Sequence, residues 1–585
     1  MITCQNCKVE FVIEAADSVF YEKLGVPSPT FCAKCRMIRR MMWRNERTLY
    51  RRECNLCNRN IVSIYSPQSP YVVYCNECFH GDRWDPISYG VEVDFTKPFF
   101  KQFQELQFKV PRLYSFVFNN TNSEYVNGAA FNKNCYLVFV SDYNEDCSYS
   151  YGLMRSKNTF DCFNCSECEL CYECINCTKC YQASFSEDCS DCQNIAFSKN
   201  LANCQDCVGC VNLRNKKYHI FNEPYSKEEY LEKLKELKLN TREGIQAAQE
   251  KLAEISPRYI SKYIHGLQNK DVSGDYISNS KASQECYDAD SLEDCKHINH
   301  GDHAKNCQDA YVIVENSQYS YEVVSAIALN NVKAGYCVWN GFDISYSDTC
   351  ENCNNLFGCV GLRKKQYCIL NKQYSKEEYE ALLPKIIQHL KDVPYSGLQG
   401  KIYGFGEFFP AELCPFAYNE TVAQDIFPLS KSEAEGKGYR WLESEARDYK
   451  VTLESASIPK TIAETDESIL KEVIACKHGG SCNDGCASAF RIAPSELQFY
   501  QRTHLPLPLL CPNCRHHRRL KQKNPPILWS RNCQCKGQTS ENAMYQNNSS
   551  HFHENDTCPN VFETSYSPKR KDILYCEQCY QAEIA

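Results

Sequence analysis

The sequence lacks the short motifs that mark the common enzyme classes. It contains no P-loop, no G-x-G-x-x-G and no G-x-S-x-G, so nucleotide binding and serine hydrolysis have no support. His-Glu-Asn at 553–555 lacks the second histidine of the H-E-x-x-H zinc proteases. Histidine is scarce throughout, with 13 residues in 585. We therefore assign no catalytic or organic-cofactor residue and favour a non-catalytic protein over an enzyme.

Long apolar runs are also missing. No window approaches the roughly 20 apolar residues that cross a membrane, and the first residues carry neither a basic nor an apolar signal region. Charged residues make up 24% of the chain, hydrophobic residues 43%, and the mean hydropathy is -0.53. We expect a cytoplasmic protein without a membrane partner, divided into about three to five folding units.

Cysteine is the residue present in excess, with 41 copies. A disulfide framework is typical of short secreted chains, and this chain is long with no visible export signal. Thiolate-bound metal in a reducing compartment is the better expectation. The net charge of -8 argues against a nucleic-acid coat over the whole surface but permits local basic patches.

The two ends of the chain are copies of one another. Residues 7–54 match residues 486–533 at one constant offset, which pairs Cys7 with Cys486 and Cys54 with Cys533. After an insertion in the C-terminal copy, Cys75 and Cys78 recur as Cys576 and Cys579. So many identities at fixed spacing indicate a duplicated unit.

Each end supplies two sets of cysteines with zinc-ribbon spacing. Paired Cys-x2-Cys knuckles provide four soft ligands for tetrahedral zinc. The N-terminal sets are Cys4, Cys7, Cys32 and Cys35, then Cys54, Cys57, Cys75 and Cys78. The C-terminal sets are Cys482, Cys486, Cys511 and Cys514, then Cys533, Cys535, Cys576 and Cys579. The sequence thus predicts about four zinc ions, one for each set.

The C-terminal ligand sets remain open in two places. Cys476 is an alternative to Cys482 in the first set. Cys558 lies in an insertion of the second set, and His551 and His553 are close to it in sequence.

A family resemblance follows from the first knuckles. The residues that carry it are Cys4-x2-Cys7, Phe11, Phe20-Tyr21, Gly25, Pro29 and Cys32-x2-Cys35-Arg36. This pattern resembles the treble-clef zinc-binding domains of bacterial proteins, and it covers residues 1–45 and again 480–525. The C-terminal copy has Thr503-His504 where Leu24-Gly25 stand. The whole chain is similar to uncharacterised bacterial zinc-ribbon proteins, which implies zinc binding but no particular activity.

Between residues 135 and 210 every cysteine lies on one three-residue lattice. The positions are 135, 147, 162, 165, 168, 171, 174, 177, 180, 189, 192, 204, 207 and 210. A period of three, with Asn-Cys or Asp-Cys marks 12 or 15 residues apart, fits a narrow β-solenoid better than a helix or a plain strand. Its interior would take small side chains such as cysteine, and Asn or Asp would suit its corners. Reduced thiols, bound metal and disulfides all remain open for these cysteines.

A second module repeats this region 149 residues later, as with Cys204 and Cys353. Its lattice is looser and includes Cys307 and Cys337. Each module ends with a capping box, Ser226 with Glu229 and Ser375 with Glu378, which predicts a closing helix.

The expected architecture is mainly β and multidomain, with zinc-ribbon or treble-clef pairs at both termini flanking two thin cysteine-rich β-solenoids. The expected order is tandem ribbons at 1–82, a helical or extended connector at 83–133, solenoid modules with capping helices at 134–245 and 246–395, an acidic linker at 396–475 and tandem ribbons at 476–585.

Basic segments follow the second knuckle at each end. Arginines with aromatic residues suit phosphate contact and base stacking, although a solvated helix is equally compatible. The candidates are Arg36, Arg39, Arg40, Trp43, Arg44, Arg47, Tyr50, Arg51 and Arg52, and Arg515, Arg518 and Arg519. We expect a non-catalytic zinc-binding scaffold that binds nucleic acid, RNA before DNA. A protein-interaction scaffold is the alternative, and a metal store or a carbohydrate-active β-helix enzyme ranks lower.

Overall fold

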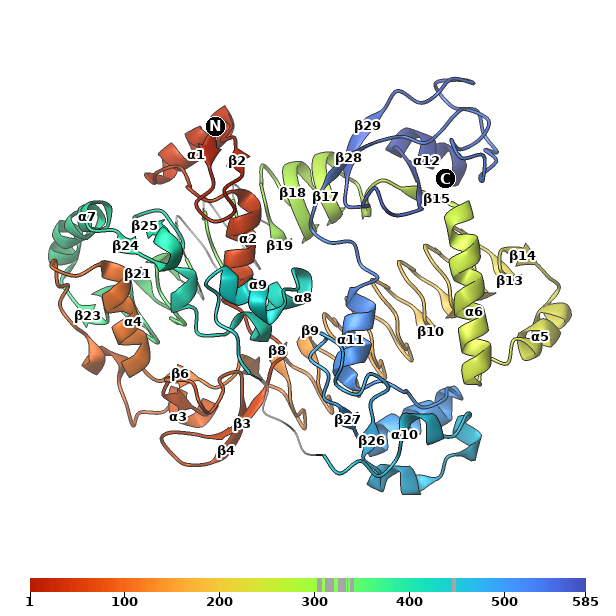
Figure 1. The fold of residues 1–585 in the computed structure, drawn as a ribbon, viewed down its shortest axis with the longest axis horizontal. Coiled ribbons are helices and arrows are strands. Elements are labelled where there is room, and N and C mark those ends of the chain that lie inside the picture. Colours follow the sequence, from red (N-terminus) through yellow and green to blue (C-terminus); the bar gives the residue numbers. More distant parts are fainter. Residues whose placement is uncertain are drawn as a thin grey trace. The chain divides into compact units, whose positions relative to one another are not determined.

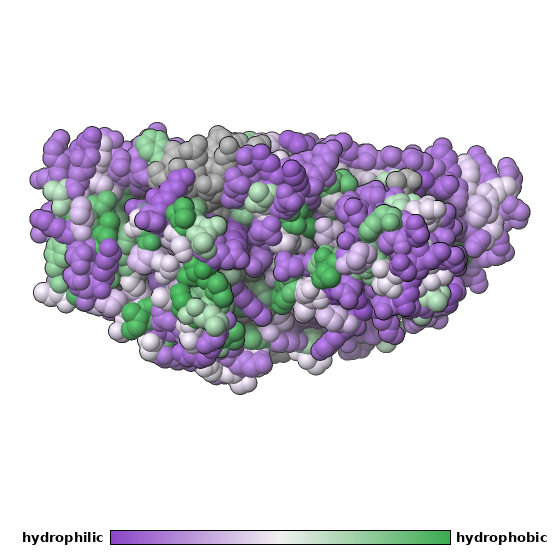
Figure 2. Space-filling model, turned by 90° about the horizontal axis from the view of Figure 1, so that it is seen from above, coloured by the Kyte–Doolittle hydropathy of each residue, from purple (hydrophilic) through white to green (hydrophobic). Residues whose placement is uncertain are grey.

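The computed structural model describes residues 1–301, 308–310, 320–324, 333, 335–336, 341–443 and 449–584. The lattice positions Cys307 and Cys337 lie outside them. The chain forms two compact units. Unit 1 contains Met1–Ser115, Ile264–Glu443 and Pro525–Leu528; unit 2 contains Phe116–Tyr263, Ser444–Asn524 and Trp529–Ala585. Within the described ranges, no helix has the length and apolar character needed to span a membrane. Hydrophilic residues predominate on the face drawn in Figure 2, with hydrophobic residues in smaller patches.

Unit 2 is built around a ladder of short parallel strands. Tyr181 pairs with Gln193, Gln193 with Gln205, and Gln205 with Lys217. Isolated parallel bridges extend the same 12-residue step from Thr121↔Lys133 to Ala202↔Arg214. The 12-residue repeat expected from the cysteines is therefore present, and no bridge in this stretch uses the 15-residue step. The strands are β7 (Val117–Phe118), β8 (Asn127–Ala130), β9 (Phe139–Asp142), β10 (Tyr181–Ser184), β11 (Gln193–Ala196), β12 (Gln205–Val208) and β13 (Lys217–Ile220). The ladder begins before residue 134, because Val126 and Ala129 fill interior positions without a cysteine.

A three-residue backbone unit explains the cysteine lattice. Every third residue from Tyr125 to Gly209 has a positive φ, and the residue after each of them is buried. Many of these positions are Asn or Asp, as with Asp161 (φ 52°), because their short polar side chains tolerate the left-handed region. The cysteines that follow are buried with free thiols. Cys177 Sγ, for example, donates to the carbonyl oxygens of Ile175 and Ser186, both at 3.5 Å.

The end of this ladder is closed by a hairpin and two helices. Strand β14 (Glu223–Pro224) pairs antiparallel with β13, and a proline on an edge strand blocks further pairing. Helix α5 (Lys227–Glu236) follows the Ser226–Glu229 capping box, which confirms the helix expected there. Helix α6 (Arg242–Ile255) packs Ala248 against the ladder (Figure 1).

Unit 1 contains a second ladder with the same step over part of its length. Phe342 pairs with Asn354 and Asn354 with Gln366. Its strands are β16 (Gly266–Leu267), β17 (Lys270–Ser278), β18 (Lys281–Asp290), β19 (Asn299–Gly301), β20 (Phe342–Ser345), β21 (Asn354–Phe357), β22 (Gln366–Ile369) and β23 (Lys372–Gln373). Helix α7 (Lys376–Asp392) begins at the Ser375–Glu378 capping box and confirms the second closing helix.

Much of the segment expected as an acidic linker is packed into unit 1. It forms β24 (Tyr395–Ser396), β25 (Ile402–Tyr403), α8 (Val422–Ile426) and α9 (Lys431–Gly436). Phe408 and Phe409 are fully buried, and Phe409 lies 4.9 Å from Trp43 between ring centroids. The expected connector contributes a buried face of helix α4 (Phe99–Lys109).

The cysteine groups at each end of the chain belong to the unit whose ladder is distant in sequence. In unit 1, β5 (Val73–Tyr74) pairs with β6 (Arg112–Leu113), and both share the unit with the second ladder. In unit 2, β30 (Ile573–Tyr575) pairs with β15 (Ile260–Lys262), and both share the unit with the first ladder. The chain therefore passes from one unit to the other immediately before each ladder.

Candidate metal centres

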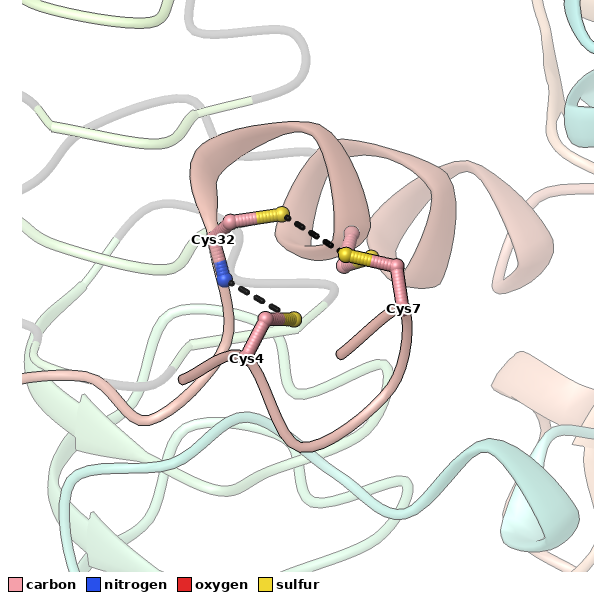
Figure 3. A group of neighbouring side chains, drawn as sticks. Cys4, Cys7 and Cys32 are labelled. Carbon is pink, nitrogen blue, oxygen red and sulfur yellow. Dashed lines mark hydrogen bonds between the residues drawn. The ribbon is translucent and has the colours of Figure 1, made fainter. Parts of the chain in front are cut away.

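The first cysteine group combines a hairpin knuckle with a helix N-terminus. Strand β1 (Ile2–Thr3) pairs with β2 (Glu10–Phe11), and Cys4 and Cys7 lie in the turn between them. Cys32 is the N-cap of α2 (Ala33–Met42), and Cys35 lies in its first turn. The four sulfur atoms are within 4.8 Å of one another. Figure 3 shows the sulfurs of Cys7 and Cys32, 3.7 Å apart, facing each other with Cys4 beside them.

Hydrogen bonds and the helix N-terminus favour thiolates in this group. The Cys32 backbone N–H donates to Cys4 Sγ at 3.3 Å, and the helix macrodipole places positive potential at the same point. Hydrogen bonds from Cys32 and Cys35 hold the pKa of the Cys4 thiol well below its usual value. A thiolate is the form that binds metal.

The second group repeats this plan. Strand β3 (Tyr50–Glu53) pairs with β4 (Asn60–Ser63) and carries Cys54 and Cys57 in the connecting turn. Cys75 is the N-cap of α3 (Asn76–His80), and its N–H donates to Cys54 Sγ at 3.3 Å. Burial raises the pKa of Cys54, but backbone N–H donors outweigh it and lower the value to about 6. Cys78 completes the group of four.

The third group gathers Cys476, the alternative to Cys482 that the sequence left open. The four gathered sulfurs belong to Cys476, Cys486, Cys511 and Cys514. Cys476 directly follows β26 (Ile474–Ala475), which pairs with β27 (Ala489–Phe490), just as Cys4 directly follows β1. Cys511 is the N-cap of α11 (Pro512–Leu520), and its N–H donates to Cys476 Sγ at 3.3 Å.

Cys482 nevertheless stays close, with its Sγ 3.6 Å from Cys514 Sγ. It lies in the lengthened turn between β26 and β27. The constant offset was misleading here because this longer turn separates the two knuckle cysteines.

The fourth group uses Cys558 in place of Cys535. Its members are Cys533, Cys558, Cys576 and Cys579, all buried. Cys533 follows β28 (Trp529–Asn532), which pairs with β29 (Val561–Thr564), and the Cys576 N–H donates to Cys533 Sγ at 3.2 Å. Cys579 lies in α12 (Glu577–Ile584). Cys535 instead joins a fifth group with His551, His553 and Cys579.

The arginines singled out in the N-terminal basic segment face the interior of unit 1. Arg36 Nε lies 2.7 Å from Asp309 Oδ2, and Arg39 Nη2 lies 2.7 Å from Glu322 Oε1. Arg39 also contacts Glu407 at 3.1 Å, and Arg40 contacts Asp309 at 3.4 Å. All three guanidinium groups are buried, so they join helix α2 to Asp309, Glu322 and Glu407.

The C-terminal copy uses the same arginine positions against the first ladder, beside which α11 is drawn in Figure 1. Arg515 Nη1 lies 2.9 Å from Asp161 Oδ2, and Arg519 Nη1 lies 3.1 Å from Asp161 Oδ1. Arg519 and Arg518 both contact Glu173, at 3.0 and 2.7 Å. Arg515 also lies 3.1 Å from Glu496. Of these three arginines, only Arg518 keeps a substantial exposure, 45% of its side chain.

Several of the remaining candidates for nucleic-acid contact also interact with other residues of unit 1. Trp43 is buried beside Tyr336 and Phe409. Arg44 pairs with Glu46 at 3.0 Å, and the Tyr50 hydroxyl donates to Glu420 at 2.7 Å.

Arg47 and Arg52 are half-buried, and Arg51 is exposed. Arg36, Arg39 and Arg40 therefore do not form an exposed basic surface, because they are enclosed with carboxylates.

Sequence reasoning missed those carboxylates. Asp309, Glu322 and Glu407 lie far along the chain from Arg36, as do Asp161 and Glu173 from Arg515. One signal was present: Glu173 and Glu322 have the same separation as Cys204 and Cys353, the spacing of the central duplication.

These groups offer sulfur donors of the kind that bind divalent metals, and most of their cysteines are buried. A scan against protein-family models finds no match for this chain, and a search of curated proteins finds no similar sequence.

Proposed function

We propose that this chain is a non-catalytic zinc-binding scaffold in which zinc ribbons clamp two cysteine-cored β-solenoids. The observation that carries the proposal is the position of the arginines relative to the ligands. Arg36 directly follows Cys35, and Arg515 directly follows Cys514. A metal ion that fixes the helix N-terminus therefore also fixes the arginines that dock the helix on its ladder.

Among the metals, zinc fits these four-cysteine groups best. Four cysteines whose sulfur atoms lie within 4.8 Å of one another would give a closed tetrahedral site without an open coordination position, which is typical of structural zinc. Binding at such a site contributes directly to folding, since the ligands are not gathered in the unfolded chain. The first ladder supports a scaffold because its interior is filled mainly by small apolar side chains and thiols, with buried serine and asparagine side chains among them.

A protein partner is favoured over nucleic acid. The basic residues that would contact phosphate are engaged with buried carboxylates, and the net charge is -8. In unit 2, Phe118 is 61% exposed, and its neighbour Phe131 stacks on exposed Tyr143 with centroids 4.8 Å apart. Exposed aromatic side chains of this kind suit protein contact.

Metal analysis of the full chain tests the zinc role. We expect at least one zinc ion for each of the four four-cysteine groups, and loss of one ion in Cys35→Ser. Cys414→Ser is the matched control, because Cys414 is a buried thiol of the same unit that donates to the Met42 carbonyl oxygen. Hydrogen exchange should show that removal of zinc deprotects α2 and α11. Unchanged protection in the metal-free protein would contradict a structural role.

RNA binding separates the two partner classes. Fluorescent single-stranded RNA should show no salt-dependent binding to the full chain between about 50 and 200 mM salt, where several phosphate contacts would change affinity strongly. Binding that weakens steeply over this range would restore the nucleic-acid interpretation.

A further inference from the structure

The C-terminal ribbon carries two histidines that its N-terminal counterpart lacks. They lie in the insertion between Cys535 and Cys558. His551 has a fully buried side chain, and its Nε2 lies 3.0 Å from Glu583 Oε1. Its other ring nitrogen, Nδ1, is buried and has no hydrogen-bond partner among the described residues. A buried imidazole nitrogen without a partner is costly unless it binds something.

His553 is held in the complementary way. Its Nδ1 lies 2.7 Å from the Asp556 carbonyl oxygen, so this nitrogen donates, and its Nε2 lies 3.3 Å from Cys579 Sγ. Each imidazole therefore has one nitrogen fixed by an oxygen acceptor and the other left for the sulfur cluster. Metal-binding histidines are typically fixed by such acceptors.

Cys579 belongs to two ligand groups at once. Its sulfur lies within 4.8 Å of those of Cys533, Cys558 and Cys576, and equally within 4.8 Å of the ligand atoms of Cys535, His551 and His553. Cys535 Sγ accepts a hydrogen bond from Asn547 Nδ2 at 3.3 Å, which suits a thiolate.

We propose that this ribbon holds two metal ions joined by the bridging thiolate of Cys579. The first ion is bound by Cys533, Cys558, Cys576 and Cys579. The second is bound by Cys535 Sγ, His551 Nδ1, His553 Nε2 and the same Cys579 Sγ. The other three cysteine groups keep the ligands described above. When the second ion binds, the thiol proton of Cys535 is released to solvent.

Charge favours the second ion. Four thiolates carry more negative charge than one divalent ion neutralises, and all four cysteines of the first site are buried. A second divalent ion adds two positive charges and brings only one further thiolate and two neutral imidazoles. The net negative charge of the cluster therefore becomes smaller. Buried charge that is not compensated destabilises a fold.

Glu583 organises the second site from outside it. This buried carboxylate lies four residues after Cys579 on α12, and so on the same helix face. It accepts hydrogen bonds from the backbone N–H groups of Asn548 and Ser549, at 2.8 and 3.1 Å, as well as from His551. The carboxylate thereby fixes the inserted loop and the ring orientation of His551 together.

The inference rests on the proposed metal-binding role, and cadmium-113 NMR of the full chain reconstituted with that metal tests it directly. We expect one resonance from a site of two sulfurs and two nitrogens, distinct from the all-sulfur resonances. It should show scalar coupling to one all-sulfur resonance through Cys579. A spectrum with all-sulfur resonances alone, or without coupling, overturns the bridged pair while leaving the zinc scaffold intact.

Metal counting with variants gives the second measurement. The double variant His551→Asn/His553→Asn, and separately Cys535→Ser, should each lose one zinc ion per chain and keep the all-sulfur resonances. His219→Asn is the control, since His219 lies in the same unit on β13. Unchanged zinc content in both variants would overturn the second site.

Discussion

The second ribbons of the two ends share one framework but present different ligands. Hairpin β3–β4 is matched by β28–β29, and in each ribbon the N-cap cysteine donates its N–H to the first knuckle cysteine. The N-terminal knuckle is Cys54-x2-Cys57, whereas Cys533 and Cys558 are separated by a long insertion. Strand pairing and the helix start thus bring the four cysteines together, while the turn between the strands accommodates added chain and further candidate ligands.

The docking of the first ribbons can be broken separately in each unit. Asp161→Ala should destabilise unit 2, and Asp309→Ala should destabilise unit 1, each by about 3–5 kcal/mol, because each leaves two buried guanidinium groups without their shared carboxylate. Hydrogen exchange during denaturation measures the two units in one sample. Glu254→Ala, which removes an exposed ion pair with Lys251, is the control and should have little effect. A loss below about 1 kcal/mol for both aspartates would show that the arginines do not hold the ribbons.

The contributions of Asp161 and Asp309 to the free energy of unfolding should also change in opposite directions with pH. Burial raises the pKa of Asp161 from 3.8 to about 6, although Arg515 and Arg519 oppose it. Burial acts on Asp309 as well, but Arg36 and Arg40 outweigh it and lower its pKa. A raised folded-state pKa means that the folded state binds more protons between pH 3.8 and about 6, so the Asp161 contribution declines as pH rises through that window. The Asp309 contribution is present above pH 3.8 and is lost at lower pH.

The measurement is unit 2 stability from pH 4 to 7 in the unmodified chain and in Asp161→Asn. The unmodified chain should lose up to about 1 kcal/mol per pH unit relative to the variant. Parallel pH profiles of the two proteins would contradict the raised pKa.

Removing the insertion tests the comparison of the second ribbons. Among these variants, we expect it to change the free energy of unfolding least. The variant removes residues 535–556, so that Cys533 and Cys558 stand two residues apart as Cys54 and Cys57 do. We expect the hairpin and the four-cysteine site to persist and one metal ion to be lost. Metal analysis with hydrogen exchange over β28 and β29 checks this. Loss of both ions would mean that the inserted loop is part of the framework.

The ligand framework could be predicted from the sequence wherever spacing was conserved. The constant offset pairs Cys486, Cys511 and Cys514 with Cys7, Cys32 and Cys35, and the structure gathers these three cysteines in one group. Cys75 matches Cys576, and the same number of residues separates Cys57 from Cys75 as separates Cys558 from Cys576. This comparison would have identified Cys558 as a member of the fourth group. Cys476 needed the strand pairing, because an insertion alters the spacing on its C-terminal side.

The central region was predictable to a similar degree. The three-residue lattice predicted the small-residue interior, and the capping boxes predicted α5 and α7. The fate of the arginines was not predictable, because a run of positive charge does not indicate which carboxylates enclose it. Their partners lie hundreds of residues away along the chain.

The alternation of the chain between units has a consequence for its synthesis. The first ribbons emerge from the ribosome long before Asp309 and Glu407, the residues that receive Arg36 and Arg39. At about 5–20 residues per second, this interval lasts roughly tens of seconds. The first ladder then waits in the same way for Arg515 and Arg519. Neither unit can therefore be completed by one local stretch of chain. Under the proposed metal-binding role, an ion bound early would keep each terminal segment folded through this delay.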